Sequence, residues 1–280
     1  MKVGITGASG FIGSNVARRM EELQVEVVSL DPLLKGCGQT DTFEKLDWVL
    51  HFAAITSISD AFKQPGAIYR NNIEATLKAL EVAIPFQSRF LYMSSYVYGR
   101  PRYLPIDENH PTAALNPYMG SKLAGEIISS QLCMQYDMPC IILRAFNIYG
   151  DSSHKGRLTA DMLEAARQNK PVTIHDPAPM RDYLYIKDFL CLLEKIINSS
   201  PAPSGVYNVG YGEAHANIDV AQLFCKLLAE DYPLIVAGSP RRNDVQEICA
   251  DRKLVSRTFS WKPQYPLERG FKDLLKSIGR

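Results

Sequence analysis

Tyr118 and Lys122 stand four residues apart in the stretch YMGSK, a spacing that can turn a phenol into a proton-transfer group. On an α-helix the Cβ atoms of residues i and i+4 lie about 6 Å apart. A lysine ammonium at that distance stabilises the phenolate and lowers the tyrosine pKa from its ordinary value of about 10. The pair therefore predicts acid/base chemistry near neutral pH. The alternative is a surface helix that carries a solvated lysine.

The same spacing recurs at Tyr183 and Lys187 in RDYLYIKD, so the backbone under each pair has to distinguish them. This second stretch alternates as a half-buried strand does, which predicts that its two side chains lie roughly 13 Å apart and share no proton. Around the first pair, apolar residues recur at helical spacing, and Asn116-Pro117 is typical of a helix start. The sequence therefore predicts a catalytic pair only at the first of the two positions.

Two serines, Ser94 and Ser95, follow the apolar run FLYM and close a predicted strand. At the edge of a sheet such hydroxyls can polarise a hydroxyl of a substrate. Serines at a strand end are also common turn formers, and that alternative stays open.

Glycines 7, 10 and 13 follow the predicted strand KVGIT and precede an amphipathic helix. Gly7 allows the tight turn, Gly10 lets the backbone approach a diphosphate, and Gly13 lets helix and strand pack closely. The helix N-terminus then offers free N–H groups to an anion. The spacing is G-x-x-G-x-x-G rather than G-x-G-x-x-G. It predicts a dinucleotide-binding loop, with a sharp turn that binds no ligand as the alternative.

Asp31 ends the second predicted strand, VEVVSLD, where a carboxylate can accept hydrogen bonds from ribose hydroxyls and would repel a 2′-phosphate. No arginine lies between residues 31 and 47 to hold that phosphate, although Lys35 leaves NADP open. We therefore expect NAD as the cofactor. The alternative for Asp31 is an acidic residue that starts the Asp31-Pro32 turn.

The elements that position these residues alternate between strands and helices in the first half of the chain. The candidate strands are Lys2–Thr6, Val25–Leu30, Trp48–Ala53, Phe90–Ser94 and Pro139–Leu143. Turn-rich pieces follow, and they separate helices near 158–168, 188–198 and 218–229 and a strand near 183–187. We predict an α/β protein with a Rossmann-like doubly wound parallel sheet and a smaller mixed C-terminal substrate-binding cap.

The predicted dinucleotide-binding domain comprises residues 1–150 with about 184–212, and the predicted cap comprises about 151–183 with 213–280. The cap is expected over the carboxyl ends of the strands, where such sheets bind ligands.

The charges balance, with 31 basic and 30 acidic residues in 280, so the chain has no field that would attract a nucleic acid or a membrane surface. The six cysteines lack metal-ligand spacing, and we expect no metal site. We see neither a signal peptide nor an apolar run of membrane-spanning length, and expect a cytoplasmic protein.

With these motifs in this order, the chain resembles the extended short-chain dehydrogenase/reductase family, specifically its NAD-dependent nucleotide-sugar epimerases, dehydratases and ketoreductases. Further stretches match the landmarks of that family in order: LDWVLHFAA, PGAIYRNNIEATLKALEVA, LRAFNIYG, RDYLYIKD, GVYNVG, RRNDV and WKPQYPLERGF. Ala75 replaces a usual glycine. Counting back four residues from Tyr98 in SSYVYG places Ser94, not Ser95, at the catalytic hydroxyl of the family.

The resemblance implies that Tyr118 exchanges a proton with the sugar, that Ser94 hydrogen-bonds the same oxygen, and that Lys122 holds the nicotinamide ribose. The implied cofactor-binding residues are Gly7, Ser9, Gly10, Phe11, Ile12, Gly13, Asp31, Ala53, Ala54, Asn72, Tyr118 and Lys122. The implied residues for a nucleotide-diphosphate sugar are Ser95, Asn147, Arg181 and Arg241.

Alternatives remain for two of these groups. Asn72 is expected to be structural rather than chemical, and each arginine could instead form a surface ion pair, Arg181 with Asp182 and Arg241 with Asp244. The resemblance also implies a homodimer, through helices near 73–84 and 118–132.

The expected function is a nucleotide-sugar 4-epimerase with a 4-keto intermediate, and the alternative is an NAD(P)H-dependent 4-ketoreductase. A 4,6-dehydratase fits less well, because Ser94-Ser95-Tyr96 replaces the Thr-Asp-Glu of those enzymes. A non-catalytic dinucleotide sensor would typically lack the Tyr/Lys pair. The region between Asp31 and Asp47 is short for the family, and Asp41 is the candidate in it for the adenine-contacting residue.

Overall fold

The computed structural model describes residues 1–36, 44–151, 156–238 and 245–280. Two compact units make up the chain. Unit 1 comprises residues 1–99, 111–145 and 193–207, and unit 2 comprises residues 100–110, 146–192 and 208–280. The assignment of cofactor binding to 1–150 with 184–212, and of substrate binding to the remainder, stays a prediction.

The central sheet has six strands in the order β2-β1-β3-β4-β5-β9. Their bounds are β1 Lys2–Thr6, β2 Glu26–Ser29, β3 Trp48–His51, β4 Arg89–Ser95, β5 Cys140–Ala145 and β9 Gly205–Val209. Strands β1 to β5 pair in parallel. The runs WVLH and CIILRA are buried throughout, as expected of parallel strands that are covered on both faces. The predicted α/β fold with a Rossmann-like parallel sheet is confirmed.

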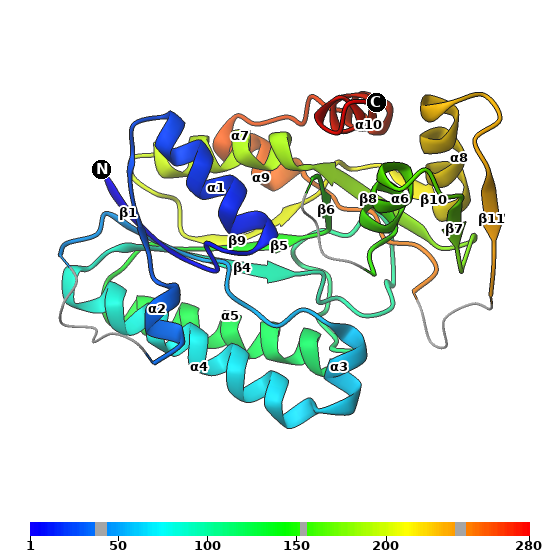
Figure 1. The fold of residues 1–280 in the computed structure, drawn as a ribbon. Helices are drawn as coiled ribbons and strands as arrows, with labels where there is room; N and C mark the ends of the chain where they lie inside the picture. Colours follow the sequence, from blue (N-terminus) through cyan, green and yellow to red (C-terminus); the bar gives the residue numbers. More distant parts are fainter. Residues whose placement is uncertain (37–43, 152–155, 239–244) are drawn as a thin grey trace. The chain divides into compact units, whose positions relative to one another are not determined.

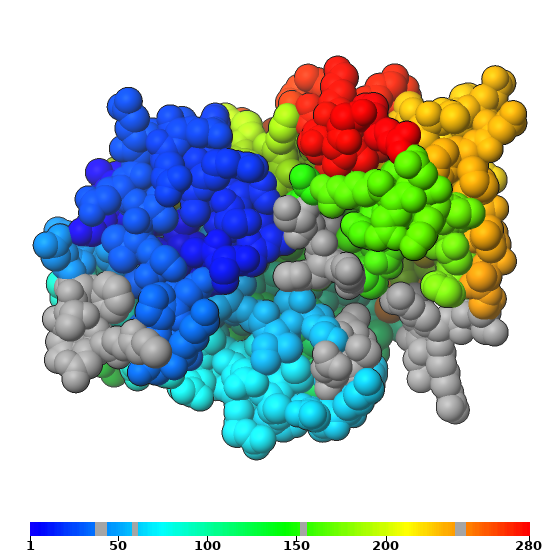
Figure 2. Space-filling view, in the orientation of Figure 1, coloured from blue at the N-terminus to red at the C-terminus, as the bar shows by residue number. Residues whose placement is uncertain are grey.

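Helices cover both faces of the sheet in unit 1. Helix α1 (Phe11–Glu22) lies on one face, and α4 (Pro65–Ala83) and α5 (Pro117–Gln135) lie on the other (Figure 1). Two short helices, α2 (Asp31–Leu34) and α3 (Ile58–Lys63), and the 3-10 helix η2 (Ile84–Phe86) complete the connections. On the face drawn in Figure 2, the blue N-terminal segment lies beside the cyan segment that holds α4.

One part of the core of unit 1 fills the layer between the sheet and helices α4 and α5. Val49, Leu80, Phe90, Cys133 and Ile142 belong to one buried hydrophobic cluster there. Such burial contributes about 25 cal/mol per Å² of apolar surface removed from water. It is the main force that holds α5 in place against β4.

Helix α5 begins where the sequence indicates. Asn116 is the N-cap, and its side-chain oxygen accepts a hydrogen bond of 2.9 Å from the backbone N–H of Met119. Pro117 occupies the first helical position, where its missing N–H costs nothing. The predicted helix start is confirmed, and it places Tyr118 in the first turn.

The predicted strand near 183–187 is wrong at its end. Strand β8 is Met180–Tyr185, and helix α7 (Ile186–Ile197) begins at once, so Lys187 lies on a helix. The Tyr183 hydroxyl bonds Asn217 at 3.1 Å, and the Lys187 ammonium pairs with Asp273 at 2.6 Å. The alternating pattern of YLYIK therefore does not reveal the change from strand to helix. As predicted, the Tyr183 and Lys187 side chains do not bond each other and have different partners.

Unit 2 holds the short strands that the sequence pattern missed. A three-stranded sheet has the order β10-β8-β6, and β11 pairs with β7. The strands are β6 Asn147–Tyr149, β7 Val172–Ile174, β10 Ala214–Ala216 and β11 Leu234–Val236. Each has three residues, which is too short for a period of two to show.

The further helices of unit 2 are α6 Leu158–Arg167, α8 Asn217–Leu228, α9 Lys253–Phe259 and α10 Leu267–Ser277. Helices α6, α7 and α8 lie where the sequence predicts helices, within two residues at each end, whereas α9 and α10 were not predicted. Phe271 on α10 packs its ring 5.3 Å from Tyr149 and 5.2 Å from Phe224, which gives this unit an aromatic core. No helix in the described part of the chain combines the length and the apolar character that crossing a membrane requires.

Candidate active site

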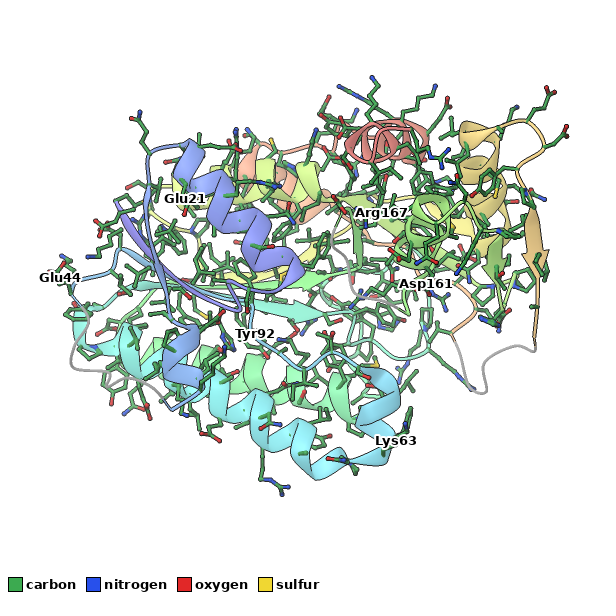
Figure 3. The ribbon with its side chains drawn as sticks, in the orientation of Figure 1. Glu21, Glu44, Lys63, Tyr92, Asp161 and Arg167 are labelled. Atoms are coloured by element: carbon green, nitrogen blue, oxygen red, sulfur yellow. The ribbon has the colours of Figure 1, made fainter. Side chains whose placement is uncertain are left out.

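Tyr118 and Lys122 occupy successive turns of α5 on the side that faces β4. Lys122 is buried, and its Nζ atom lies 4.3 Å from the centre of the Tyr92 ring. Tyr92 projects from the sheet towards the layer of α4 and α5 (Figure 3). Burial raises the pKa of Tyr92, and the neighbouring Tyr118 and Glu126 charges raise it further. Tyr92 is thus a neutral phenol. Its ring contacts Lys122, and its pKa is raised by the nearby Tyr118.

The Lys122 ammonium carries a desolvation cost. Burial lowers the pKa of Lys122 to about 7, and the Glu126 carboxylate acts in the opposite direction. The aromatic face of Tyr92 offers partial compensation through a cation–π contact. Lys122 can therefore change its charge state near neutral pH in this structure.

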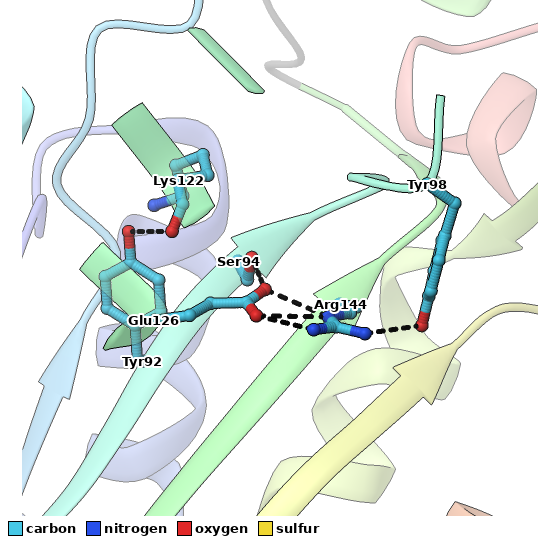
Figure 4. A network of polar contacts seen from close by, with 6 residues as sticks. All are labelled: Tyr92, Ser94, Tyr98, Lys122, Glu126 and Arg144. Atoms are coloured by element: carbon cyan, nitrogen blue, oxygen red, sulfur yellow. Dashed lines mark hydrogen bonds and ion pairs between the residues drawn. The ribbon is translucent and has the colours of Figure 1, made fainter. Parts of the chain in front are cut away.

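Ser94 lies at the carboxyl end of β4 and faces α5. Its hydroxyl donates a hydrogen bond to Oε1 of Glu126, which sits one turn beyond Lys122 (Figure 4). Ser94 is in register with Arg144 on β5, and the Arg144 guanidinium holds the Glu126 carboxylate through Nε at 3.0 Å and Nη2 at 2.7 Å. The structure thus brings Ser94 to the helix face that carries the Tyr/Lys pair.

Ser95 is the next residue on the strand, and successive side chains of a strand point to opposite faces. It is half-buried and in register with Ala145. The structure therefore separates the two serines, and Ser94 is the one on the α5 side. The role of Ser95 in substrate binding stays a prediction.

The glycine loop has the geometry of a close strand-to-helix turn. Gly7 has φ +72°, which favours glycine, and its carbonyl accepts a 2.9 Å bond from the N–H of Gly10. A Cβ on Gly13 would fall within 3.0 Å of Gly7 backbone atoms. The helix then starts at Phe11 and Ile12 with no side-chain cap on Gly10. Its first N–H groups are available to an anion.

Asp31 turns its carboxylate towards the glycine loop, a contact that the sequence did not reveal. Oδ1 accepts hydrogen bonds from the N–H groups of Gly7 and Ala8, and Oδ2 accepts from the N–H and hydroxyl of Ser9. A carboxylate offers about four acceptor positions. A ribose hydroxyl that binds Asp31 would have to share or replace these loop donors.

A cavity of about 210 Å³ lies beside the loop in unit 1. Its lining includes three residues predicted to bind the cofactor, Ala53, Ala54 and Asn72. The complete lining is Leu34, Ala53, Ala54, Ile55, Asn71, Asn72, Glu74, Ala75 and Lys78.

Asn72 is buried and makes hydrogen bonds within unit 1, and its role at the cofactor stays a prediction. Its side-chain oxygen accepts from the N–H of Ile55 at 2.8 Å, and its amide nitrogen donates to the Ser121 hydroxyl at 2.9 Å. Ser121 in turn donates to the backbone oxygen of Tyr118 at 2.8 Å. Asn72 therefore ties the cavity wall to the first turn of α5.

His51 is a buried group that the sequence analysis did not single out. The Thr76 hydroxyl donates its hydrogen bond to the Asn72 carbonyl at 2.9 Å. Because that proton is used, Nε2–H of His51 donates to the Thr76 oxygen at 3.0 Å. Nδ1 then accepts from the Thr6 hydroxyl at 2.6 Å. Burial lowers the pKa of His51 well below its usual value, and Lys122 lowers it further. The sequence could have indicated His51, because a histidine inside the apolar run WVLHF is expected to be buried and therefore to need hydrogen-bond partners.

In unit 2, Asn147 and Arg181 lie on the adjacent strands β6 and β8. The amide of Asn147 donates to the Asp182 carbonyl at 3.1 Å, and Nη1 of Arg181 donates to the Met180 carbonyl at 2.9 Å. Burial raises the pKa of Asp182 to about 6. Arg241 and Asp41 lie outside the described residues.

The Asp182 carboxylate accepts hydrogen bonds from the N–H groups of Tyr211, Gly212 and Ala250. The Arg252 charge also acts on this carboxylate and lowers its pKa. The choice between a substrate contact and an ion pair for Arg181 stays a prediction.

Comparisons with known proteins agree with these features. The sequence model of the NAD-dependent epimerase/dehydratase family matches residues 3–210. A UDP-glucose 4-epimerase of Lactobacillus helveticus is 26% identical, over 95% of this chain and 93% of that protein. The structure of a Thermus thermophilus UDP-glucose 4-epimerase in complex with NAD superposes with a TM-score of 0.85 at 23% identity, over 100% of this chain and 99% of the other.

A longer plant protein is similar as well. The trifunctional UDP-glucose 4,6-dehydratase/UDP-4-keto-6-deoxy-D-glucose 3,5-epimerase/UDP-4-keto-L-rhamnose-reductase of Arabidopsis thaliana is 29% identical over 96% of this chain. The match covers 45% of that protein, so the chain spans about half of its length.

Proposed function

The chain belongs to the NAD-dependent epimerase/dehydratase family, and on that premise we propose that it is a UDP-sugar 4-epimerase that works through a 4-keto intermediate. NAD is the cofactor of this family. The observation that carries the proposal is the face of α5 that presents Tyr118 and Lys122 beside Tyr92 and Ser94. The choice of UDP is supported by the names of the similar proteins.

The residues of unit 1 fit a dinucleotide. The glycine turn and the first N–H groups of α1 suit a diphosphate, and the cavity walls at Ala53 and Ala54 leave room beside them. Asp31 would hold the adenosine ribose once it exchanges part of its contacts with the loop. Its negative charge disfavours the extra phosphate of NADP.

When bound, NAD supplies a reversible hydride acceptor for a carbon that bears a hydroxyl. Tyr118 would take the proton of the C4 hydroxyl as the ketone forms and would return it when the ketone is reduced. Lys122, in its charged form, would stabilise the Tyr118 phenolate. Ser94 would hold the same sugar oxygen. Because the proton and the two electrons both return, an epimerase needs no external reductant.

A second candidate is a 4-ketoreductase. The Arabidopsis relative carries a UDP-4-keto-L-rhamnose-reductase activity in its name, and this favours the same chemistry run once in one direction. A dehydratase has weaker support, because Tyr96 stands where those enzymes carry an acid, and its hydroxyl bonds the Gly99 carbonyl.

The homodimer through residues 73–84 and 118–132 stays a prediction.

The test uses the purified chain with no added cofactor. We expect bound NAD and interconversion of UDP-glucose with UDP-galactose, and we expect CDP-, GDP- and dTDP-sugars to react more slowly. A requirement for added NADH or NADPH together with a 4-keto sugar would move the assignment to a reductase. Binding of NAD without turnover on any nucleotide sugar, unchanged in Tyr118→Phe, would indicate a sensor.

A further inference from the structure

Glu126 extends the functional face of α5 by one more turn. Tyr118, Lys122 and Glu126 are spaced by four residues, which places them on one side of a helix. The Glu126 side chain is only 7% exposed. A carboxylate in such a place needs a specific set of partners.

Those partners are Ser94 and Arg144. The Arg144 guanidinium grips both carboxylate oxygens, with Nη2 at 2.7 Å from Oε2 and Nε at 3.0 Å from Oε1. Arg144 is itself fixed, because its Nη1 donates to the Tyr98 hydroxyl at 3.1 Å and its charge lies 5.0 Å from the centre of that ring. Glu126 is thus held rigidly as the ionised member of a bidentate pair.

The direction of the bond from Ser94 follows from this pairing. An ionised carboxylate accepts hydrogen bonds and donates none. The Ser94 hydroxyl must therefore give its single proton to Glu126. What the Ser94 oxygen still offers to other groups is its lone pairs.

We propose that Glu126 is a positioning residue that determines specificity: by accepting the Ser94 proton it leaves Ser94 only its lone pairs, so that Ser94 accepts from a sugar hydroxyl at the reacting carbon and cannot donate to another group there. This inference rests on the proposed function, which places Ser94 and Tyr118 at the same sugar oxygen. The Tyr118 phenolate and the Ser94 oxygen are both acceptors. They are satisfied by a donor that lies between them, which is the hydroxyl on the reacting carbon of the sugar. The hydroxyl proton is shared until Tyr118, the stronger base, takes it.

The test compares the binding of two ligands that differ in one donor, UDP-glucose and UDP-4-deoxy-4-fluoroglucose. Binding is measured calorimetrically on the NAD-loaded protein in the Tyr118→Phe background, which prevents turnover and isolates Ser94. We expect the hydroxyl ligand to bind about tenfold more tightly, the scale of one hydrogen bond. Ser94→Ala should reduce that ratio to within about twofold.

Glu126→Gln leaves the buried Arg144 charge without its partner and can fail to fold. The second variant is therefore Glu126→Leu/Arg144→Met, which replaces the ion pair with apolar groups of similar volume. It frees the Ser94 proton, which Ser94 can then also donate to the fluorine of the second ligand, so the ratio should fall below that of the parent protein. The matched control, Glu268→Leu/Lys272→Met, removes an exposed salt bridge on α10 and should keep the full ratio.

A folded Glu126→Leu/Arg144→Met protein that keeps the tenfold ratio overturns the role of Glu126. A Ser94→Ala protein that keeps the ratio overturns the contact with Ser94. Turnover of the chain with Tyr118 intact is measured separately. If the chain is inactive but the affinity ratios change as expected in the variants, the proposed function is contradicted and the role of Glu126 stands. If the chain is active but the variants keep the ratio of the parent protein, the role of Glu126 is contradicted and the proposed function stands.

Discussion

The Nζ atom of Lys122 lies 4.3 Å from the centre of the Tyr92 ring, so a buried ammonium rests on the face of a buried phenol. The contact places the charge of Lys122 between the sheet and α5, within electrostatic range of His51. Because the aromatic face attracts a cation while burial disfavours one, small changes in the surroundings decide the charge of Lys122.

Replacing Tyr118 by Phe removes the proton acceptor and leaves the ring. We expect kcat on a UDP-sugar to fall by about 10²- to 10⁴-fold, the usual contribution of general acid–base catalysis. NAD binding should change little, which calorimetry checks. Tyr183→Phe is the control, because Tyr183 has the same spacing to a lysine but bonds Asn217 in unit 2. An equal loss of activity in both variants would contradict the role given to Tyr118.

Lys122→Met tests the burial of the ammonium through the pH dependence of stability. Lys122 has a pKa of about 7 in the folded protein against 10.5 for the free side chain. Between these values the unfolded chain binds more protons, so the wild-type free energy of unfolding should rise with pH. We expect the advantage of Lys122→Met to be largest and constant below pH 7 and to shrink by about 1.4 kcal/mol per pH unit from pH 7 towards pH 10.

Urea titrations of the NAD-free proteins at several pH values provide the measurement. Parallel stability curves for the wild type and Lys122→Met would show that Lys122 keeps its ordinary pKa.

Asp31→Asn should weaken NAD binding by about 10- to 100-fold, because hydrogen bonds to a charged group contribute about 1.5–3 kcal/mol. The preference for NAD over NADP should narrow as well, since the charge that repels the 2′-phosphate is gone. Calorimetric titration with both cofactors measures the two effects. Glu26→Gln, which removes an exposed carboxylate on β2, is the control. Unchanged discrimination in Asp31→Asn would place the selecting group elsewhere.

Gly125→Ala should destabilise the protein by about 1–3 kcal/mol, the typical cost of overpacking a core. An added Cβ would fall within 3.0 Å of the Tyr92 hydroxyl, and the Tyr92 ring has no room to retreat because it is buried. In Gly66→Ala, on α4, the Cβ meets only the flexible end of Arg70, so we expect no loss. Thermal denaturation compares the two, and equal melting temperatures would contradict this account.

Local sequence patterns predicted the framework of unit 1. The five candidate strands coincide with β1 to β5 within a few residues, and Asn116-Pro117 marks the start of α5. Such features depend on neighbours a few positions away, through apolar periodicity, caps and glycine turns. The face shared by Tyr118 and Lys122 follows from the same local rule.

Local patterns failed where an element is short or changes type without a break. The three-residue strands of unit 2 gave no readable period, and RDYLYIK passes from β8 into α7 within one alternating run. A strand and a helix can both bury every second or third residue over so short a stretch.

The sequence alone determined which chemical groups this protein carries and which of them share a helix face or a turn, because those relations span only one or two turns of chain. The tertiary structure decided their partners. It paired Asp31 with the loop donors, fixed His51 between Thr6 and Thr76, and gave the Ser94 proton to Glu126. These contacts join residues 22 to 45 positions apart, and only strand register and helix packing bring such residues within hydrogen-bond distance.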